Sequence, residues 1–529
     1  MIFIPVRFIP LILLLSCIDN IIAQTSFQKT FGGIYDDHCF SVNPITDKGF
    51  ILAGYTNSYG AGANDFYLIK TDSVGNTIWT KTYGGTGDDE AYAAQQTTDG
   101  GYIVAGYSNS FATFYDAYLI KTNALGDTLW TKTYGSNKDD YINSIQQTTD
   151  GGFILAGYTT GFISGADSGS IYLIKTDANG NLSWSKALGG TNGYNDGYRV
   201  RQTTDKGYII TGYTNGFGEP NGDAFLCKTD SMGTVSWTKT YGSSGVDWGN
   251  SVKQTPDGGY IIVGSSSFDS TNLIDVYLIR TNTIGDTLWT KTYGGLGYDY
   301  GQSVEQTTDG GYIITGYTNG CDTCNYNVYL IKTDANGNLI WSNTNGGVED
   351  DEGNAVHQTS DGGYLVGGFS NSFSSGDDDF YMIKTDANGN SCNQTNATNI
   401  MKSPHTIQTT QTMQLYTANT IMHSAATQVD TGNTTTVICY PTGIKSFHQN
   451  QVSINVFPNP TTGLFSLQLN PSTENNIAVT ITNNLGETVY NTAIQSSKEI
   501  NLQNLASGIY VIRVQFSCGI CSQKITLIK

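Results

Sequence analysis

Aspartate recurs at fixed places in this chain, and its oxygens suit either loop structure or a cation site. The motif Asp-(Gly/Lys)-Gly followed by an aromatic residue occurs seven times, at Asp47, Asp99, Asp150, Asp205, Asp257, Asp309 and Asp361. Ten residues before each motif stand Asp37, Asp89, Asp140, Asn195, Asp247, Asp299 and Asp351. Carboxylate oxygens suit calcium, but a loop aspartate also bonds its own backbone. The aspartates of this second set are therefore expected to hold their own loops. The alternative is that they bind a ligand or calcium on one face, and no other cofactor is expected.

A second position stays polar while its chemistry changes between copies. It lies four residues before each motif aspartate and is occupied by Asn43, Gln95, Gln146, Arg201, Lys253, Glu305 and His357. If this segment is innermost in the fold, these side chains line a central channel or its mouth. A water-filled channel and a specific ligand site both fit this variation.

Catalytic signatures are scarce. The histidines are His38, His357, His405, His423 and His448, and no Gly-x-Ser-x-Gly, His-Glu-x-x-His or P-loop motif is present. A carboxylate pair that cleaves glycosidic bonds remains compatible with the many acids. Because the acids recur with the repeat, we expect a binding or scaffold protein rather than an enzyme. The alternative is a carbohydrate-active extracellular enzyme that uses acids on the loop face.

The elements that position these residues form an internal repeat. The motif aspartates are 52, 51, 55, 52, 52 and 52 residues apart, a period typical of propeller blades or β-solenoids. Each unit holds four strand-sized runs with glycine turns between the first two and the last two. The fourth run begins near a large aromatic side chain suited to filling the space between sheets: Trp79, Trp130, Trp184, Trp237, Trp289 and Trp341.

Residues 27–390 resemble the bacterial seven-bladed β-propeller repeat family. The resemblance is carried by Asp-Gly-Gly-Tyr-Ile-x-x-Gly-Tyr-Thr and Asp-x-Tyr-Leu-Ile-Lys-Thr-Asp-x-x-Gly. It implies an all-β fold with seven blades of four strands. The seventh unit lacks its tryptophan run, whereas residues 27–33 match the segment 289–295. We therefore expect residues 27–31 to pair antiparallel with 380–385 and to close the last blade.

The chain after residue 390 has a different composition. Residues 391–451 are rich in Thr, Asn and Gln and are predicted to be a linker. Residues 452–529 are predicted to form a small β-sandwich with a core around Phe457, Leu467, Val479, Ile481, Tyr510, Ile512 and Ile525. This segment contains Pro458-Asn459-Pro460, Asn-x-x-Gly, Gly508-Ile509-Tyr510-Val511 and a final lysine. Together these motifs resemble the type A C-terminal sorting domain of type IX secretion in Bacteroidetes. That resemblance implies the secretion machinery as a partner and removal of the domain after export.

The N-terminus predicts export through the periplasm. Residues 1–23 combine Arg7, a short apolar stretch and a small residue at Ala23, as in a signal peptide. Lipidation at Cys17 is the alternative. The net charge of −19 argues against nucleic acid as a partner, and no segment is long enough to span a membrane. We expect a secreted or cell-surface protein whose partner is an unknown extracellular polymer or protein.

The cysteines fit an exported protein. Those expected to form disulfides are Cys321, Cys324, Cys392, Cys439, Cys518 and Cys521. Cys39 and Cys227 lie in strand-like runs and are expected to be buried thiols. The Cys-x-x-Cys spacing at 321–324 and 518–521 leaves zinc or redox chemistry open, but no metal site is predicted.

Overall fold

The computed structural model describes residues 26–528 apart from 163–168, 190–192, 220, 269–272, 321–324, 393, 398–399, 403–406, 412–413, 418–420, 424–427, 431–434, 440–452, 458–460, 471–476, 484–487, 496 and 517–518. The expected signal peptide, residues 1–23, lies outside this part. All regular structure in it is β-strand, with no helix. No helix of a length and hydropathy suited to crossing a bilayer occurs among the described residues.

Residues 27–384 supply four strands to each of seven antiparallel sheets. In six sheets all four strands come from one unit of the repeat, and in the last sheet the fourth strand comes from the N-terminus. The first strands are β2 (Asp37–Pro44), β6 (Asp89–Gln96), β10 (Asp140–Gln147), β14 (Asn195–Gln202), β18 (Asp247–Gln254), β22 (Asp299–Gln306) and β26 (Asp351–Gln358). The second strands are β3 (Phe50–Thr56), β7 (Tyr102–Ser108), β11 (Phe153–Thr159), β15 (Tyr208–Thr214), β19 (Tyr260–Ser266), β23 (Tyr312–Thr318) and β27 (Tyr364–Ser370).

The third strands are β4 (Asp65–Thr71), β8 (Asp116–Thr122), β12 (Ser170–Thr176), β16 (Asp223–Thr229), β20 (Asp275–Thr281), β24 (Asn327–Thr333) and β28 (Asp379–Lys384). The fourth strands are β5 (Thr77–Gly84), β9 (Thr128–Gly135), β13 (Leu182–Gly189), β17 (Val235–Gly242), β21 (Thr287–Gly294), β25 (Leu339–Asn345) and, for the last sheet, β1 (Phe27–Phe31).

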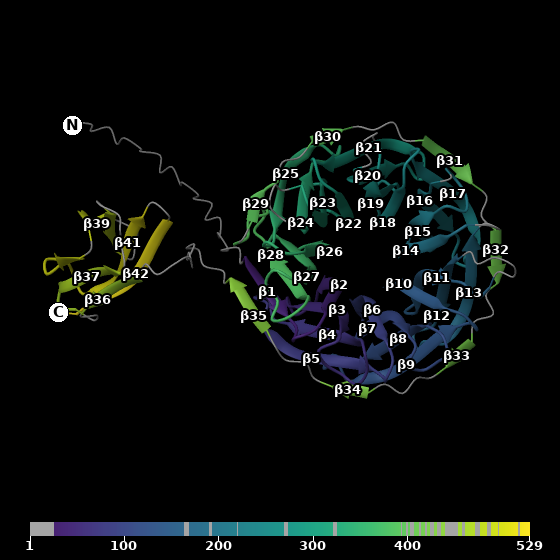
Figure 1. Cartoon of the computed structure of the whole chain (residues 1–529), viewed down its shortest axis with the longest axis horizontal. Helices are drawn as coiled ribbons and strands as arrows, with labels where there is room; N and C mark the ends of the chain where they lie inside the picture. The colour runs from purple at the N-terminus through teal and green to yellow at the C-terminus, as the bar shows by residue number, and fades with distance from the viewer. Residues whose placement is uncertain are drawn as a thin grey trace, which may run out of the picture.

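The sheets stand side by side around a central opening, in a propeller-like ring (Figure 1). The first strand of every sheet lies next to this opening. Strand β2 contacts both β6 and β26, so the first and last sheets are neighbours. The first strands therefore present their side chains to a common central space.

A β-bulge occurs in every first strand. In β14 the pairing with β15 shifts between Gly197 and Arg199, and the equivalent shift is found in the other six sheets. A bulge bends the strand and changes the direction of nearby side chains. It places the residue at the bulge, as well as its neighbours, where they can face the opening.

The motif aspartates hold the turn between the first two strands. Asp309 accepts hydrogen bonds from the Gly311 N–H and the Thr307 hydroxyl. Its carboxylate also pairs with Lys332 of the third strand at 2.9 Å. Equivalent ion pairs join the motif aspartates to Lys70, Lys121, Lys175, Lys228, Arg280 and Lys384. The recurrence of these acids thus has a structural cause.

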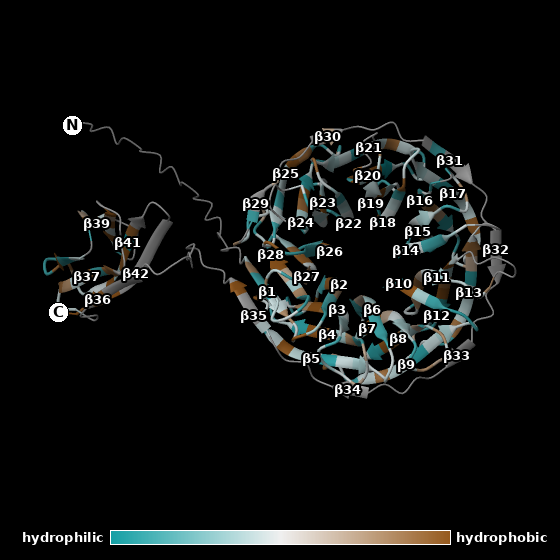
Figure 2. Cartoon of the chain, in the orientation of Figure 1, coloured by the Kyte–Doolittle hydropathy of each residue, from teal (hydrophilic) through white to brown (hydrophobic). Residues whose placement is uncertain are grey.

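Hydrophobic and hydrophilic residues alternate along the strands (Figure 2), and the hydrophobic ones pack between neighbouring sheets. Each tryptophan of a fourth strand lies against a hairpin glycine of the next sheet. Gly180 has φ +74°, and a Cβ atom there would come within 2.8 Å of the Trp130 indole. The Tyr134 hydroxyl donates to the Gly180 carbonyl at 2.6 Å. The expectation that the tryptophans fill the space between sheets agrees with this packing.

The N-terminal strand pairs as predicted. Strand β1 is antiparallel to β28, with Phe27 opposite Lys384 and Phe31 opposite Phe380. All five residues of β1 are buried. The N-terminal strand thus completes the last sheet. The predicted antiparallel pairing of residues 27–31 with residues 380–385 is confirmed.

Residues 394–439 differ from the expected linker, because they add a fifth strand to the outer edge of every sheet (Figure 1). These strands are β29 (Gln394–Asn396), β30 (Ile400–Lys402), β31 (Ile407–Gln411), β32 (Gln414–Thr417), β33 (Ile421–His423), β34 (Gln428–Asp430) and β35 (Thr435–Cys439). They pair in turn with β25, β21, β17, β13, β9, β5 and β1, so this segment, which we call the belt, runs around the ring against the chain direction.

The belt follows a seven-residue period. Gly294, Gly242, Gly189, Gly135 and Gly84 hold equivalent places in the fourth strands, and they face Ile400, Ile407, Gln414, Ile421 and Gln428. A fourth strand without this partner would expose unpaired backbone groups along its edge. Threonine, which is abundant here, favours extended strands. The amino-acid composition of this segment therefore did not indicate that it forms a regular series of strands.

The C-terminal residues form two sheets around one core, described here by itself. One sheet contains β36 (Ser453–Phe457), β37 (Leu464–Asn470) and β40 (Ser497–Asn501). The other contains β38 (Ile477–Thr482), β39 (Thr488–Ile494), β41 (Gly508–Phe516) and β42 (Gly519–Leu527). The core includes Leu467, Val479, Ile481, Tyr510, Ile512 and Ile525, as expected. The side chain of Phe457 lies outside the described part.

Candidate ligand-binding site at the centre of the ring

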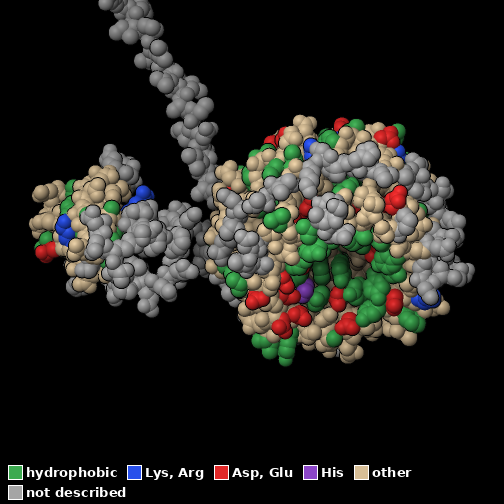
Figure 3. Space-filling model, turned by 45° about the horizontal axis from the view of Figure 1, so that its top comes forward, with side chains coloured by type: hydrophobic (Ala, Val, Ile, Leu, Met, Phe, Trp, Pro, Cys, Tyr) green, Lys and Arg blue, Asp and Glu red, His purple; other side chains and the backbone are tan. Residues whose placement is uncertain are grey.

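A cavity of about 450 Å³ opens at the centre of the ring. We call it the mouth cavity. Figure 3 shows a hollow lined by hydrophobic side chains, a class that includes tyrosine there, with acidic side chains gathered around it and few basic ones. The lining residues are Phe40, Tyr92, Asn143, Asp196, Tyr198, Arg199, Trp248, Asn250, Ser265, Tyr300, Gln302, Tyr317, Glu352 and Asn354.

Most of this lining comes from two positions of the first strands. Seven residues before the motif aspartate stand Phe40, Tyr92, Asn143, Tyr198, Asn250, Gln302 and Asn354. Nine residues before it stand His38, Glu90, Tyr141, Asp196, Trp248, Tyr300 and Glu352. All seven residues of the first position and four of the second, namely Asp196, Trp248, Tyr300 and Glu352, line one cavity although they are far apart in the chain, because all first strands face the opening. The sequence analysis did not single out either position.

The aromatic rings of the mouth cavity form pairs. Phe40 stacks on Tyr92 with ring centroids 4.4 Å apart, and Tyr300 lies 4.8 Å from Tyr317. Several amides link neighbouring first strands: Asn250 donates to the Gly301 carbonyl at 2.8 Å, and Asn354 donates to the Cys39 carbonyl at 3.0 Å. The walls are therefore held by contacts between sheets, which favours a preformed cavity.

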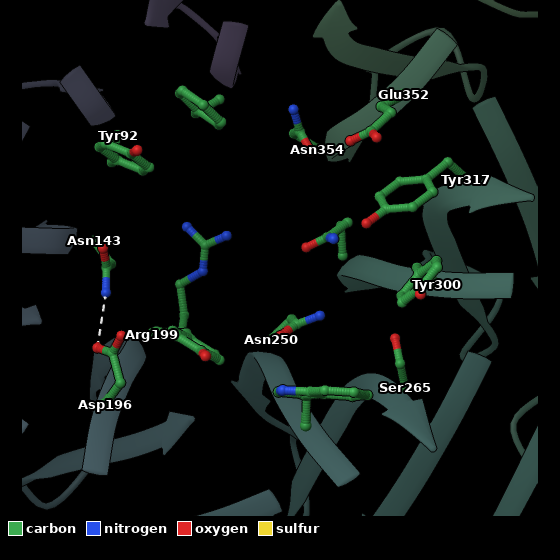
Figure 4. A pocket seen from close by; sticks show the side chains of 14 residues that line it. Tyr92, Asn143, Asp196, Arg199, Asn250, Ser265, Tyr300, Tyr317, Glu352 and Asn354 are labelled. Atoms are coloured by element: carbon green, nitrogen blue, oxygen red, sulfur yellow. Dashed lines mark hydrogen bonds between the residues drawn. The ribbon is translucent and has the colours of Figure 1, made fainter. Parts of the chain in front are cut away.

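Two carboxyl groups of the cavity have raised pKa values. Burial raises the pKa of Asp196 to about 7, against hydrogen bonds from Tyr194 and Asn143. Burial, and then the charges of Asp350 and Asp378, raise the pKa of Glu352 to about 8. Figure 4 shows these two carboxyls on opposite sides of the cavity, with Asn143 bonded to Asp196 at 3.0 Å. Near neutral pH both carry part of their protons and can donate hydrogen bonds to a ligand.

A second cavity, of about 160 Å³, lies further along the opening. We call it the throat. It is lined by six of the predicted channel residues, namely Asn43, Gln95, Gln146, Arg201, Lys253 and His357. The seventh, Glu305, pairs with His357 at 2.8 Å. Arg199 lines both the throat and the mouth cavity, and sequence reasoning missed it.

The aspartates proposed to bind a cation are buried at the start of the first strands: Asp37, Asp89, Asp140, Asp247, Asp299 and Asp351. Each accepts a hydrogen bond from the backbone N–H four residues before it, at 2.6 to 2.9 Å. Burial raises the pKa of Asp247 to about 7 and that of Asp140 and Asp351 to about 6. This geometry fits the structural alternative, in which each aspartate holds its own loop.

One group of potential metal ligands occurs among the described residues, and it is not one that the sequence indicated. It consists of Asp36, His38 and Asp378, with His38 Nε2 2.9 Å from Asp378 Oδ2. Asp36 is exposed. His38 lies between Tyr55 and Phe369, with ring centroids 5.0 and 4.2 Å away. The aromatic contacts and the ion pair account for this arrangement.

Three of the cysteines lie in the described part of the chain with their side chains. Cys39 and Cys227 are buried free thiols, as expected. Cys392 is disulfide-bonded. The side chains of Cys321, Cys324, Cys439, Cys518 and Cys521 lie outside the described part of the chain, so their pairing stays a prediction.

Comparison with known proteins identifies the C-terminal domain. Residues 455–529 match the family model described as "Secretion system C-terminal sorting domain". No curated protein matches the chain. One similar solved structure is PorZ, described as an essential bacterial surface component of the type-IX secretion system of Porphyromonas gingivalis. The TM-score is 0.37 at 10% identity, and the match covers 94% of this chain and 60% of that one. The family match over residues 455–529 supports secretion through the type IX system and implies export to the cell surface or the outside.

Proposed function

We propose that this chain is an exported seven-bladed β-propeller that binds a saccharide chain in its mouth cavity. The observation that carries the proposal is the lining of that cavity, which combines aromatic rings with amides and carboxyls. A sugar ring offers apolar C–H faces and hydroxyl edges. Aromatic rings cover the faces, while amides and carboxyls bond the edges.

Two observations support seven blades. The structure has seven such sheets, and the innermost strand of the first sheet, β2, contacts the innermost strand of the last sheet, β26. Strand β1 completes the seventh sheet by pairing with β28, which is consistent with this number. The position of β1 also explains why the seventh unit carries no tryptophan strand of its own.

The route of export follows from both ends of the chain. Residues 1–23 act as the signal peptide for entry into the periplasm, and the type A sorting domain directs passage across the outer membrane. Its removal leaves the ring secreted or attached to the surface. Because the ring is then outside the outer membrane, we expect its partner to be an extracellular polymer.

A glycan array probed with the purified full chain tests binding. We expect Trp248→Ala and Tyr300→Ala to weaken binding about tenfold or more, since buried aromatic contacts dominate such interfaces. Tyr35→Ala is the matched control, because Tyr35 is an exposed aromatic residue of the propeller-like ring that does not line the mouth cavity. Absence of binding to any saccharide, or equal binding by all variants, would contradict the proposal.

Carbohydrate cleavage is a second candidate, favoured by the raised pKa of Glu352 and Asp196 in the mouth cavity. A general acid in glycoside hydrolysis needs a carboxyl that stays protonated near neutral pH. The sign of cleavage is the appearance of new reducing ends when a bound saccharide is incubated with the protein. Glu352→Gln should then abolish turnover while binding persists. Binding without new reducing ends supports the first proposal.

A further inference from the structure

Arg199 departs from the internal repeat at a place where the fold needs no long side chain. Six residues before the motif aspartate, the other six copies have Ser41, Ala93, Ser144, Ser251, Ser303 and Ala355. The six small residues show that the sheets assemble without a guanidinium there. The repeat thus provides its own comparison, and Arg199 is the single large and charged exception.

Two further cations stand beside Arg199. Arg201 lies two residues along β14, and Lys253 lies on the neighbouring strand β18. Burial, and then the charge of Arg201, lower the pKa of Lys253 to about 8. Burial and the charge of Arg199 lower that of Arg201 to about 9. Three positive groups therefore converge in a chain that has 26 basic against 45 acidic residues.

These cations have an acidic neighbour, Glu305, whose charge favours the charged forms of Arg201 and Lys253. Among the described residues, none of the three forms an ion pair; the nearby acid Glu305 pairs with His357. Arg201 donates to the Val200 carbonyl at 2.8 Å and to the Ser144 hydroxyl at 3.4 Å. The Arg199 Nε is buried without a hydrogen-bond partner. One carboxylate beside three half-buried cations leaves the cluster with a net positive charge. Such a charge excess destabilises a fold, so the cluster indicates a binding role.

Position makes the cluster accessible from the mouth cavity. Arg199 lines both cavities, and Figure 4 shows its side chain extending into the middle of the mouth cavity. A ligand lying against Trp248 and Tyr300 can therefore reach Arg199 with a side group. The planar guanidinium presents parallel N–H donors, which suit carboxylate and sulfate oxygens.

We propose that Arg199, Arg201 and Lys253 bind an anionic group of the ligand, so that the saccharide recognised here is acidic, with a carboxylate or sulfate directed into the throat. This inference rests on the proposed saccharide-binding function and specifies its ligand class. Glu305, whose charge acts on Arg201 and Lys253, repels a second anion. Asp350 and Asp378 near the mouth, whose charges act on Glu352, disfavour densely charged polymers. The site therefore selects a sparsely charged acidic saccharide.

An array of neutral, uronate-bearing and sulfated saccharides on common backbones tests this with the full chain. We expect wild type to prefer acidic forms at least about tenfold over neutral counterparts, because hydrogen bonds to charged groups are stronger than those between neutral groups. Arg199→Ser, which installs the residue found in four other copies, should remove that preference. Lys138→Ser, at an exposed loop position, changes the net charge equally and should retain it. Preference for uronate or for sulfate identifies which anion is recognised.

Inorganic sulfate provides a second measurement that needs no saccharide. Binding to the folded state raises the Tm, so sulfate should raise the Tm of wild type more than that of Arg199→Ser, with sodium chloride of equal ionic strength as the reference. Equal shifts in both proteins, or equal array binding of neutral and acidic forms, would overturn the throat site and leave saccharide binding standing. Absence of all saccharide binding together with a sulfate shift specific to wild type would overturn saccharide binding and leave the anion site standing.

Discussion

Phe27 packs against Gly75 in the way that each tryptophan packs against the equivalent glycine of the next sheet. A Cβ atom on Gly75 would lie 2.6 Å from Cε2 of Phe27, and one on Gly180 would lie 2.8 Å from Cη2 of Trp130. Phe27 comes from the N-terminal strand, yet it makes the contact between the last sheet and the first. Closure of the ring therefore uses the same packing as every other junction.

Truncation of Phe27 should destabilise the ring more than any nearby surface change. Its side chain is fully buried, and Phe→Ala in a core costs about 3–5 kcal/mol. We expect Phe27→Ala to lower the free energy of unfolding in urea by this amount. Ile34→Ala, at a position 65% exposed, is the control and should change it little. Similar unfolding midpoints for the two variants would contradict the role of β1 in closure.

Replacing the belt should make the ring associate. If residues 394–439 are exchanged for a Gly/Ser spacer of equal length, seven fourth strands lose their outer partners. Unpaired strand edges template association with other chains. Light scattering after size-exclusion chromatography should show oligomers, together with a lower Tm. A monomer with an unchanged Tm would mean that the belt adds nothing to stability.

The sequence was sufficient for the ring strands but not for the belt or for Arg199. A period near 52 residues is carried by strong turn and aromatic signals, so the four strands of each sheet could be predicted. The belt has a period of seven residues within a Thr-rich composition, marked only by Ile400, Ile407 and Ile421. The unusual size and charge of Arg199 become evident only when the seven copies are aligned at the bulge. That alignment places Arg199 at the position of a small residue, such as Ser251, in the other copies. Its approach to Lys253 depends on neighbouring strands and required the structure.

Buried aspartates should make the ring less stable as the pH rises from about 4 to about 7. Burial, and then the charge of Asp140, raise the pKa of Asp116 to about 7, whereas an unfolded aspartate titrates near 3.9. Between these values the folded chain binds more protons than the unfolded chain, so the free energy of unfolding falls with rising pH. The contribution is fully present below about pH 4 and is lost once the pH exceeds about 7.

Asp116→Asn isolates this effect. The equivalent position is Ser170 in one copy and Asn327 in another, so a neutral residue is tolerated. We expect the Tm difference between pH 4.5 and pH 7.5, measured by calorimetry, to be smaller in the variant than in wild type. Parallel losses of Tm in both proteins would show that Asp116 does not hold a proton in the folded state.

Calcium should leave the stability of the ring nearly unchanged. The recurring aspartates that suggested a cation site accept backbone N–H groups within their own loops, as Asp351 does from Gly347 at 2.8 Å. Their carboxylates are buried and do not form an open coordination shell. Millimolar calcium should therefore not raise the Tm relative to magnesium or to chelator. A rise of several degrees specific to calcium would instead revive the cation site.

The sorting domain should be absent from the mature protein, while the belt should be retained. A cut before Cys439 would remove part of β35 and expose the edge of β1, whereas a cut between Cys439 and Val452 leaves all seven sheets intact. The C-terminal domain has its own core, so it can be removed without opening the ring. We expect intact-mass analysis of protein from the medium or cell surface to place the new C-terminus in this interval.

Deletion of residues 452–529 should trap a folded, protease-resistant ring in the periplasm. Native protein that still ends at Lys529 would show that the domain is permanent, and export of the deletion variant would show that the domain is not the address.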